Sequence, residues 1–176
     1  MGKTKLRIYT WPEGILRKKC QRVGKVDEEV RGLLDEMLSL MRISGGAGLA
    51  GNQAGLDLSL IVIEVENHIF KLVNPEIVKR EGSVSFPEGC LSFPGLELEV
   101  KRGNKVWISA LNEEGKPVEI EAEGFLAVIF QHEIDHIKGV AFIDRVSFWQ
   151  KIKAYPKLRK IIRRTKNRLR KQEEKY

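Results

Sequence analysis

The chain has 176 residues, of which 42% are hydrophobic and 31% are charged, a composition that excludes wholesale disorder and fits one globular domain, with or without an appendage. The net charge of +7 is concentrated at one end: residues 151–176 hold 12 Lys or Arg and two Glu, whereas residues 1–150 hold 19 basic and 22 acidic residues. This distribution excludes a uniformly basic nucleic-acid-binding domain and indicates a basic helical extension, residues 151–176, on a mildly acidic body, residues 1–150.

The cysteine count and the apolar runs bear on the compartment. Cys20 and Cys90 are too few for a disulfide framework, which fits a reducing compartment, and Cys20 is interpreted as a small core residue. No run approaches the roughly 18 apolar residues that a membrane span needs, and residues 1–10 lack the apolar core of a secretory signal. We expect a cytoplasmic monomer that binds no membrane; a processed protein of an organellar stroma or matrix would look the same.

The first predicted element is a helix over residues 27–42. Asp27 can cap this helix, and apolar residues recur at helical spacing from Val30 to Met41. Four glycines then fall within residues 45–51, which is too many for a stable helix interior. We therefore expect a loop there, or a backbone that another group approaches closely.

Residues 58–123 are predicted to be mostly β-structure. Two short apolar runs, 58–66 and 69–74, are split by a hairpin-like break, and residues 85–95, with two prolines and two glycines, separate them from a second β block. The strands of the second block are expected at 96–100, 105–111 and 117–123.

Helices are predicted again towards the end of the chain. Residues 125–137 return to helical spacing, with Gly139 as a cap just beyond their end. Ser147 and Gln150 fit the capping box of a further short helix, and Pro156 suits the first turn of a last, basic helix. Strands clustered between helices at both ends predict an α+β fold rather than alternating βαβ units.

The sharpest motif is His132-Glu133-Ile134-Asp135-His136. On a helix, positions i and i+4 lie about 6 Å apart on one face, so His132 and His136 could bind one metal ion, while Glu133 could reach a water on that metal. Residues 125–130 are almost wholly apolar, so the helix is expected to be buried, and buried polar groups need partners. The alternative is two surface histidines on a polar helix.

A catalytic metal site needs three protein ligands and an open position. The only other histidine, His68, falls in the predicted turn and is interpreted as a surface residue. No further histidine follows His136 at the spacing that metzincins use. Cys90 is therefore the predicted third ligand, and a Cys/His/His set suits zinc, iron or nickel.

Three separated blocks resemble the three signatures of the peptide deformylase family. They are residues 46–53 (GAGLAGNQ), 88–92 (EGCLS) and 131–136 (QHEIDH), and the resemblance extends over roughly residues 6–145. Gly51 stands where the first signature usually has an alanine, and Ala47 is smaller than the usual branched residue, which is expected to widen the substrate pocket. The resemblance implies mixed, mainly antiparallel β-sheets packed around a central metal-binding HExxH helix, with an N-terminal helix and a C-terminal basic helix.

The resemblance also implies an activity: removal of the N-formyl group from the N-terminal formyl-methionine of nascent polypeptides, with release of formate. Cys90, His132 and His136 would hold one divalent metal, natively Fe²⁺, for which Zn²⁺, Ni²⁺ or Co²⁺ can substitute. Metal-bound water would be the nucleophile, with Glu133 as general base and then general acid. The remaining implied catalytic groups are the donors to the oxyanion, the Gln53 side chain and the backbone N–H of Leu91.

An apolar slot for methionine is predicted beside the metal. Phe125, Val128 and Ile129 share a helix face with His132, although simple core packing would give the same spacing. The glycines near the site could let an extended peptide pair with the backbone as an added strand. The full predicted substrate set is Gly46, Ala47, Gly48, Phe86, Gly89, Phe125, Val128 and Ile129. Arg102 could position the peptide or pair with Glu88, and a surface ion pair is the commoner arrangement.

The basic C-terminal helix suggests a partner. In the family that this chain resembles, a C-terminal helix docks on the ribosome near the exit tunnel, and a cationic helix suits phosphate backbones. The alternative is a solvated helix without a partner. The predicted contacts are Arg163, Arg164, Lys166, Arg168 and Arg170.

Two other functions compete with deformylation. A zinc endopeptidase is disfavoured because no later motif supplies its usual third ligand. A nucleic-acid-binding protein with a vestigial site is disfavoured because the reactive set is intact. That set comprises Gln53, Cys90, His132, Glu133 and His136.

Overall fold

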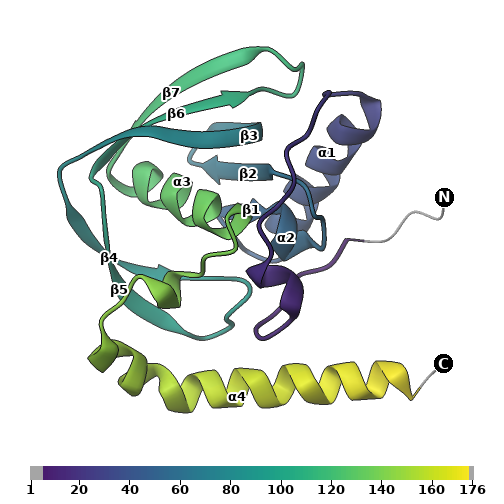
Figure 1. The fold of residues 1–176 in the computed structure, drawn as a ribbon, viewed down its shortest axis with the longest axis vertical. Coiled ribbons are helices and arrows are strands. Elements are labelled where there is room, and N and C mark those ends of the chain that lie inside the picture. The colour runs from purple at the N-terminus through teal and green to yellow at the C-terminus, as the bar shows by residue number, and fades with distance from the viewer. Residues whose placement is uncertain (1–5, 175–176) are drawn as a thin grey trace.

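The computed structural model describes residues 6–174, and they form the expected α+β fold (Figure 1). A five-stranded sheet has the order β1-β2-β3-β6-β7, and β4 pairs with β5 in a second sheet; all of these pairings are antiparallel. The helices are α1 (Glu28–Ile43), α2 (Gly51–Ala54), α3 (Gly124–Ile137) and α4 (Phe148–Glu173), with 3-10 helices η1 (Gly14–Arg17) and η2 (Phe142–Asp144). The strands are β1 (Gly48–Ala50), β2 (Leu60–Val65), β3 (His68–Glu81), β4 (Val84–Gly89), β5 (Glu97–Arg102), β6 (Lys105–Leu111) and β7 (Pro117–Glu123).

The five-stranded sheet is covered by a helix on each face. Strand β2 shows this clearly, because its successive side chains point to opposite faces. Ile61 and Ile63 pack in the cluster that contains the apolar residues of α3, whereas Leu60 and Val62 pack with α1. This double burial explains why β2 is a continuous apolar run rather than an alternating one.

Helix α1 forms as the sequence predicts. The Asp27 carboxylate accepts a hydrogen bond from the Val30 backbone N–H at 3.0 Å, which caps the first turn. The apolar stripe, including Leu34, Met37 and Met41, is fully buried against the sheet. Packing of this stripe supplies most of the stability of such a helix.

The glycine-rich segment is more ordered than the loop that we expected. Gly48–Ala50 forms strand β1 at the edge of the large sheet, and Gly51–Ala54 forms the short helix α2. A β-carbon at Gly51 would collide with the Leu58 carbonyl oxygen, so the expected close backbone approach is confirmed. Pairing with β2 overrides the low intrinsic propensity of glycine for regular structure.

Strand β4 falls largely within the segment that separates the two predicted β blocks. It was not predicted because the segment contains proline. It pairs with β5 along its whole length, and Pro87 lies opposite Glu99. Because β4 has only one strand neighbour, its other edge makes no hydrogen bonds to a strand that a proline could remove. Strand β3 also extends beyond the predicted end, to Glu81, by pairing with β6 after a register shift.

The C-terminal helix is a single element rather than two. Ser147 caps it through the Gln150 N–H, as predicted, but the helix then runs through Pro156 to Glu173. Proline removes one backbone hydrogen bond, and burial of Ala154 and Ile161 on either side holds the helix in place against η2 and the β5 region. The proposed division at residue 150 falls inside this helix and stays a prediction.

Helix α3 ends where the sequence predicts. Gly139 has a φ of +74° and its N–H bonds to the His136 carbonyl at 2.9 Å. A β-carbon at this position would also lie 2.5 Å from the Arg17 carbonyl oxygen. Within residues 6–174, no helix combines the length and apolar character that crossing a membrane requires.

Candidate metal centre and active site

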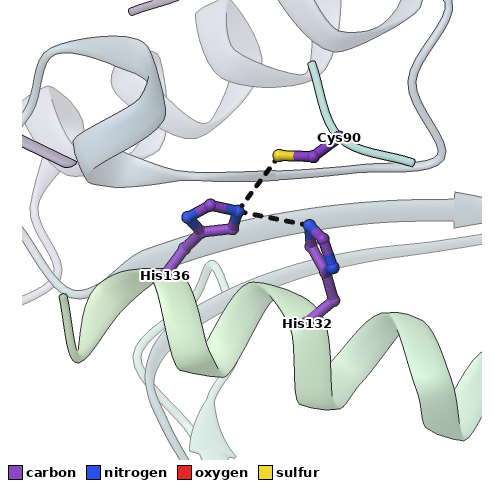
Figure 2. Close-up of side chains that lie close together, drawn as sticks. All are labelled: Cys90, His132 and His136. Atoms are coloured by element: carbon purple, nitrogen blue, oxygen red, sulfur yellow. Dashed lines mark hydrogen bonds between the residues drawn. The ribbon is translucent and has the colours of Figure 1, made fainter. Parts of the chain in front are cut away.

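Three side chains that could bind one metal ion converge between β4 and α3 (Figure 2). Cys90 directly follows β4, and His132 and His136 lie one turn apart on α3. The Nε2 atom of His136 lies 3.3 Å from the Cys90 Sγ and 3.2 Å from the His132 Nε2. The three potential ligand atoms all lie within 4.8 Å of one another, so one ion can contact all of them.

The surroundings of these donors fit a divalent metal. Both imidazoles are buried, and burial together with the neighbouring His132 holds the pKa of His136 well below its ordinary value, so this imidazole is neutral. Its Nδ1 atom finds no hydrogen-bond partner among the described residues. Burial opposes protonation of His132, but hydrogen bonds to Cys90 and Glu88 raise its pKa well above the ordinary value, so this imidazole must lose a proton when an ion binds. Two imidazoles facing a thiol are a donor set that zinc or ferrous iron accepts.

Glu133 lies beside Cys90, His132 and His136 in the lining of one pocket or the adjoining turn of α3. Its Oε2 atom is buried and has no hydrogen-bond partner among residues 6–174. Burial raises the pKa of Glu133 to about 7, although the charge of His132 opposes this shift. A carboxylate with that pKa is suited to both accepting and donating a proton near neutral pH.

Gln53 reaches the centre from α2. Its side-chain oxygen accepts the Ala50 N–H at 2.8 Å, which fixes the orientation of the amide. The Nε2 atom then lies 3.3 Å from the Cys90 Sγ and 3.3 Å from the Ser92 Oγ. The side chain therefore presents an N–H donor directly at the metal-ligand cluster.

A pocket of about 630 Å³ opens above the cluster, with His132, Glu133 and Cys90 in its lining. Its apolar wall comes from both β4 and α3: the rings of Phe86 on β4 and Phe125 on α3 lie 5.2 Å apart. Every residue of the predicted substrate set lines it, namely Gly46, Ala47, Gly48, Phe86, Gly89, Phe125, Val128 and Ile129. The contacts that each makes with a substrate stay predictions.

Comparison with known proteins decides the family. The family model of polypeptide deformylase matches residues 5–151. The chain belongs to the polypeptide deformylase family. A peptide deformylase from Aquifex aeolicus is 44% identical over 165 residues, which cover 90% of this chain and 98% of that protein.

Solved deformylase structures share the fold. The crystal structure of a plant peptide deformylase aligns with a TM-score of 0.90 and 36% identity, covering 96% of this chain and 95% of that one. A peptide deformylase from Legionella pneumophila aligns with a TM-score of 0.84 and 41% identity, covering 89% and 95%. The predicted resemblance is thus confirmed over most of the molecule.

Cys20 and His68, the remaining cysteine and histidine of the sequence, lie away from the three clustered side chains. Cys20 is buried in the core next to α3, where burial raises its pKa to about 11, so it is a neutral packing residue. His68 is exposed at the first position of β3 rather than in the preceding turn. Neither contributes a ligand atom to the cluster.

Sequence reasoning missed the residue that orients His132. The Nδ1–H of His132 donates to the Glu88 carboxylate at 2.7 Å, which directs its Nε2 atom towards Cys90 and His136. Burial opposes ionisation of Glu88, but hydrogen bonds from Arg102 and His132 hold its pKa below the ordinary value. Glu88 was visible as a carboxylate two residues before the cysteine ligand, and that proximity is the signal that could have identified it.

Arg102 pairs with Glu88, one of the two roles proposed for it, but the pair is not at the surface. Its Nε and Nη2 atoms donate to Glu88 at 2.6 and 3.0 Å, and its side chain is only 5% exposed. Arg102 is absent from the pocket lining, so direct contact with the peptide is not supported. The guanidinium also donates to Asp135 on α3, a buried contact that no sequence pattern indicated.

The five cationic residues predicted to bind the ribosome lie on α4, outside the pocket. Arg163, Arg164, Lys166 and Arg170 are exposed. Arg168 differs, because it donates to Glu13 at 2.6 Å and to the Thr10 hydroxyl at 3.2 Å. This residue fastens α4 to the N-terminal segment.

Proposed function

We propose that this protein removes the formyl group from the N-terminal formyl-methionine of nascent polypeptides and releases formate. The observation that carries the proposal is the convergence of Cys90, His132 and His136 at one end of an apolar pocket, with the unpartnered Glu133 carboxylate beside them. Membership of the deformylase family indicates which reaction takes place. The side chains at the buried, polar end of this pocket can bind the metal ion and transfer the proton that the reaction needs.

The thiolate of Cys90 and the imidazoles of His132 and His136 would hold one divalent ion. When bound, the ion supplies Lewis-acid activation of water and of the formyl carbonyl. We propose Fe²⁺ as the native ion because the resemblance to the deformylase family implies it. Zn²⁺, Ni²⁺ and Co²⁺ could substitute, because a set of one thiolate and two imidazoles suits all four ions. Glu88 supports this role by holding His132 in the tautomer that has a free Nε2.

Glu133 moves the proton. Its pKa of about 7 lets the carboxylate accept a proton from the attacking water and then give it to the amine that leaves. The reaction adds water across the formamide C–N bond, and formate and a free amino terminus are the products. One carboxylate can perform both transfers because the proton that it accepts is the proton that the leaving amine needs.

Two N–H donors are proposed to stabilise the tetrahedral oxyanion. The first is the Gln53 amide, whose orientation is fixed by its bond to Ala50. The second is the backbone N–H of Leu91, the residue after the cysteine ligand. Losing one such donor typically costs about 3 kcal/mol of transition-state stabilisation.

The methionine side chain is proposed to enter between Phe86, Phe125, Val128 and Ile129. This wall is apolar and lies directly beside His132 and Glu133, so it can hold an unbranched thioether side chain next to the reacting formyl group. The small Ala47 also lines the pocket, which supports the expectation of a wide entrance. Gly46, Gly48 and Gly89 offer backbone groups to the rest of the peptide.

Formate release tests the proposal directly. Protein purified and loaded with Fe²⁺ under anaerobic conditions should release formate from formyl-Met-Ala but no acetate from acetyl-Met-Ala. Cleavage of an internal bond in an unformylated peptide would indicate the endopeptidase instead. Absence of turnover after iron loading, with the metal shown to be bound, would contradict the proposal.

We further propose that α4 docks on the ribosome. The exposed Arg163, Arg164, Lys166 and Arg170 support this, since ribosomal phosphates attract such a cationic helix. Because α4 also buries Ala154, Ile161 and Thr165 against the body, deleting it would disturb the fold. A better test replaces the four cationic residues with glutamine. Ribosome binding should then weaken and become less salt-sensitive, whereas the turnover of formyl-Met-Ala should not change. Equal ribosome affinity in the quadruple variant would contradict docking.

A monomer in the cytoplasm, or in an organellar stroma or matrix, is the working state that we propose. All of the residues assigned to the metal, the proton transfer and the pocket come from one chain. Formylated nascent chains are the substrate, so the enzyme must act where they are synthesised.

A further inference from the structure

A continuous series of charged hydrogen bonds runs from His132 to the segment that precedes α4. Glu88 accepts from His132 and from Arg102, and Arg102 also donates to Asp135. Asp135 in turn accepts from Arg145, from its Nε at 2.9 Å and its Nη2 at 2.5 Å. The series therefore links the metal-ligand cluster to a residue about half exposed on the surface.

Counting only its arginines and carboxylates, this series is balanced when Arg145 is present. The side chains of Arg102, Glu88 and Asp135 are 5%, 3% and 4% exposed, so one guanidinium faces two carboxylates in a buried region. Arg145 is the second cation, and its side chain is 43% exposed. Removing it would leave two buried carboxylates competing for Arg102, and a buried charge without a full partner is costly.

In this competition for Arg102, the contact with Glu88 is the one that would weaken. Asp135 lies on α3, so it cannot follow the guanidinium without moving the helix that carries both histidine ligands. Arg102, at the end of β5, would shift towards Asp135 and loosen its two-bond contact with Glu88. Glu88 would then hold the Nδ1–H of His132 less firmly, and second-sphere partners of this kind govern how tightly a ligand binds its metal.

We propose that Arg145 is a positioning residue for the metal centre, acting through Asp135 and Arg102 to hold Glu88 on His132. Arg145 directly follows η2 and lies two residues before Ser147, the cap of α4. The segment that leads into α4 is thereby tied to the retention of the metal. This inference rests on the metal centre proposed above and makes no use of the ribosome proposal.

Metal release provides a test that does not depend on turnover. Protein loaded with Zn²⁺ is mixed with a chromophoric chelator in excess, and the rate of zinc transfer is measured for the wild type, Arg145→Ala and Arg145→Lys. Release from Arg145→Ala should be at least about 10-fold faster, the lower end of the effect of losing a second-sphere partner. Arg145→Lys should lie between the two, because an ammonium keeps the charge but cannot make the planar two-bond contact.

A matched control separates this effect from loosening of the same segment. Arg17 donates to Asp144, the neighbour of Arg145, and its side chain is 40% exposed. Within the described part of the chain, no hydrogen bond leads from this ion pair to the metal ligands, and at those ligands its positive charge contributes only to lowering the pKa of His136. Arg17→Ala interrupts no part of the series and removes a positive charge that disfavours a cation at His136, so this variant should release zinc no faster than the wild type. Circular dichroism of each variant checks that the fold is retained.

The outcomes are distinguishable. Wild-type release rates in Arg145→Ala, or equal acceleration in Arg17→Ala and Arg145→Ala, would overturn the positioning role while leaving the metal centre intact. Failure of the wild-type protein to take up any divalent ion would instead overturn the proposed function. A graded increase from wild type through Arg145→Lys to Arg145→Ala, with release from Arg17→Ala no faster than from the wild type, supports the inference.

Discussion

Gly48 lies directly against the carboxylate of Glu133. A β-carbon built at Gly48 would lie 2.5 Å from the Glu133 Oε1 and 2.8 Å from its Cγ. The glycine of the first signature thus leaves the space that the side chain of Glu133, the proposed proton-transferring residue of the third signature, occupies. This contact joins β1, at the edge of the large sheet, to the face of α3 that carries Glu133.

Gly48→Ala should impair catalysis without removing the metal ligands. The added methyl group must displace Glu133, and a displacement of about 1 Å can cost roughly 100-fold in rate. We expect kcat for formyl-Met-Ala to fall by about that factor, with metal content by elemental analysis unchanged. Wild-type kcat in Gly48→Ala would show that Glu133 has room to move.

Gly32→Ala is the matched control for this substitution. Gly32 lies in α1, and no atom outside its own helix lies within 4 Å of the place that a methyl group would occupy. This variant should keep full activity and gain about 1 kcal/mol of stability in denaturant unfolding, because alanine favours the helix over glycine.

Glu133→Gln should bind metal normally and lose nearly all turnover. The amide keeps the size of the side chain but cannot accept the proton of water, and a positioned general base contributes roughly 100- to 10,000-fold. The metal content should match that of the wild type because Glu133 is not among the three convergent ligands. Turnover within a few-fold of the wild type would remove Glu133 from the mechanism.

Removal of the metal should lower the melting temperature reversibly. Without the ion, Cys90, His132 and His136 keep their donor atoms clustered without a shared partner, and a ligand present at 1,000 times its Kd stabilises the folded state by about 4 kcal/mol. Calorimetry of chelated and reconstituted protein measures this difference. In Cys90→Ser, the gain on adding zinc should shrink, because a hydroxyl is a poorer zinc ligand than a thiolate. An equal gain in both proteins would exclude Cys90 as a ligand.

Glu13 should make stability depend on pH in the acid range. Burial opposes its ionisation, but Arg7, the Thr10 N–H and Arg168 hold the pKa of Glu13 below its ordinary value of 4.5. Because the folded-state pKa is the lower one, the stabilisation is complete above about pH 4.5 and is lost as the pH falls through the folded-state pKa. Glu13→Gln should therefore melt at a lower temperature than the wild type at pH 7, and the gap should close as the pH falls below 4.5 through the folded-state pKa of Glu13. A gap that stays constant over this range would contradict the ionised ion pair.

Gly139→Ala should destabilise the protein while sparing the centre. The position has a positive φ, and the methyl group would lie 2.5 Å from the Arg17 carbonyl oxygen, which is backbone and cannot swing aside. We expect a loss of about 1–3 kcal/mol in denaturant unfolding. Zinc binding by the folded fraction should be retained, since the residue lies beyond the last ligand on α3.

Secondary structure that depends on local sequence patterns was predictable. Elements that depend on pairing or packing with distant parts of the chain were not. Helix α1 and strands β6 and β7 match their predicted ranges because their periodicity and caps are local features. Strand β4 was not predicted because proline is unfavourable in a strand that is paired on both edges. Whether one or both edges are paired is decided by the sheet and not by the local sequence. The continuation of α4 through Pro156 likewise depends on what its flanking residues pack against.

The sequence by itself determined the reactive groups: a His-x-x-x-His pair with its glutamate, a cysteine in a small-residue setting, and a glutamine after a glycine-rich run. Residue type and helical spacing are enough to state which atoms can bind a metal or carry a proton. Only the tertiary structure decided how those groups are held, through Glu88 on His132, Arg102 between two carboxylates, and Gly48 against Glu133. Such contacts join strands and helices far apart in the chain, and their energies come from burial, which no local pattern encodes.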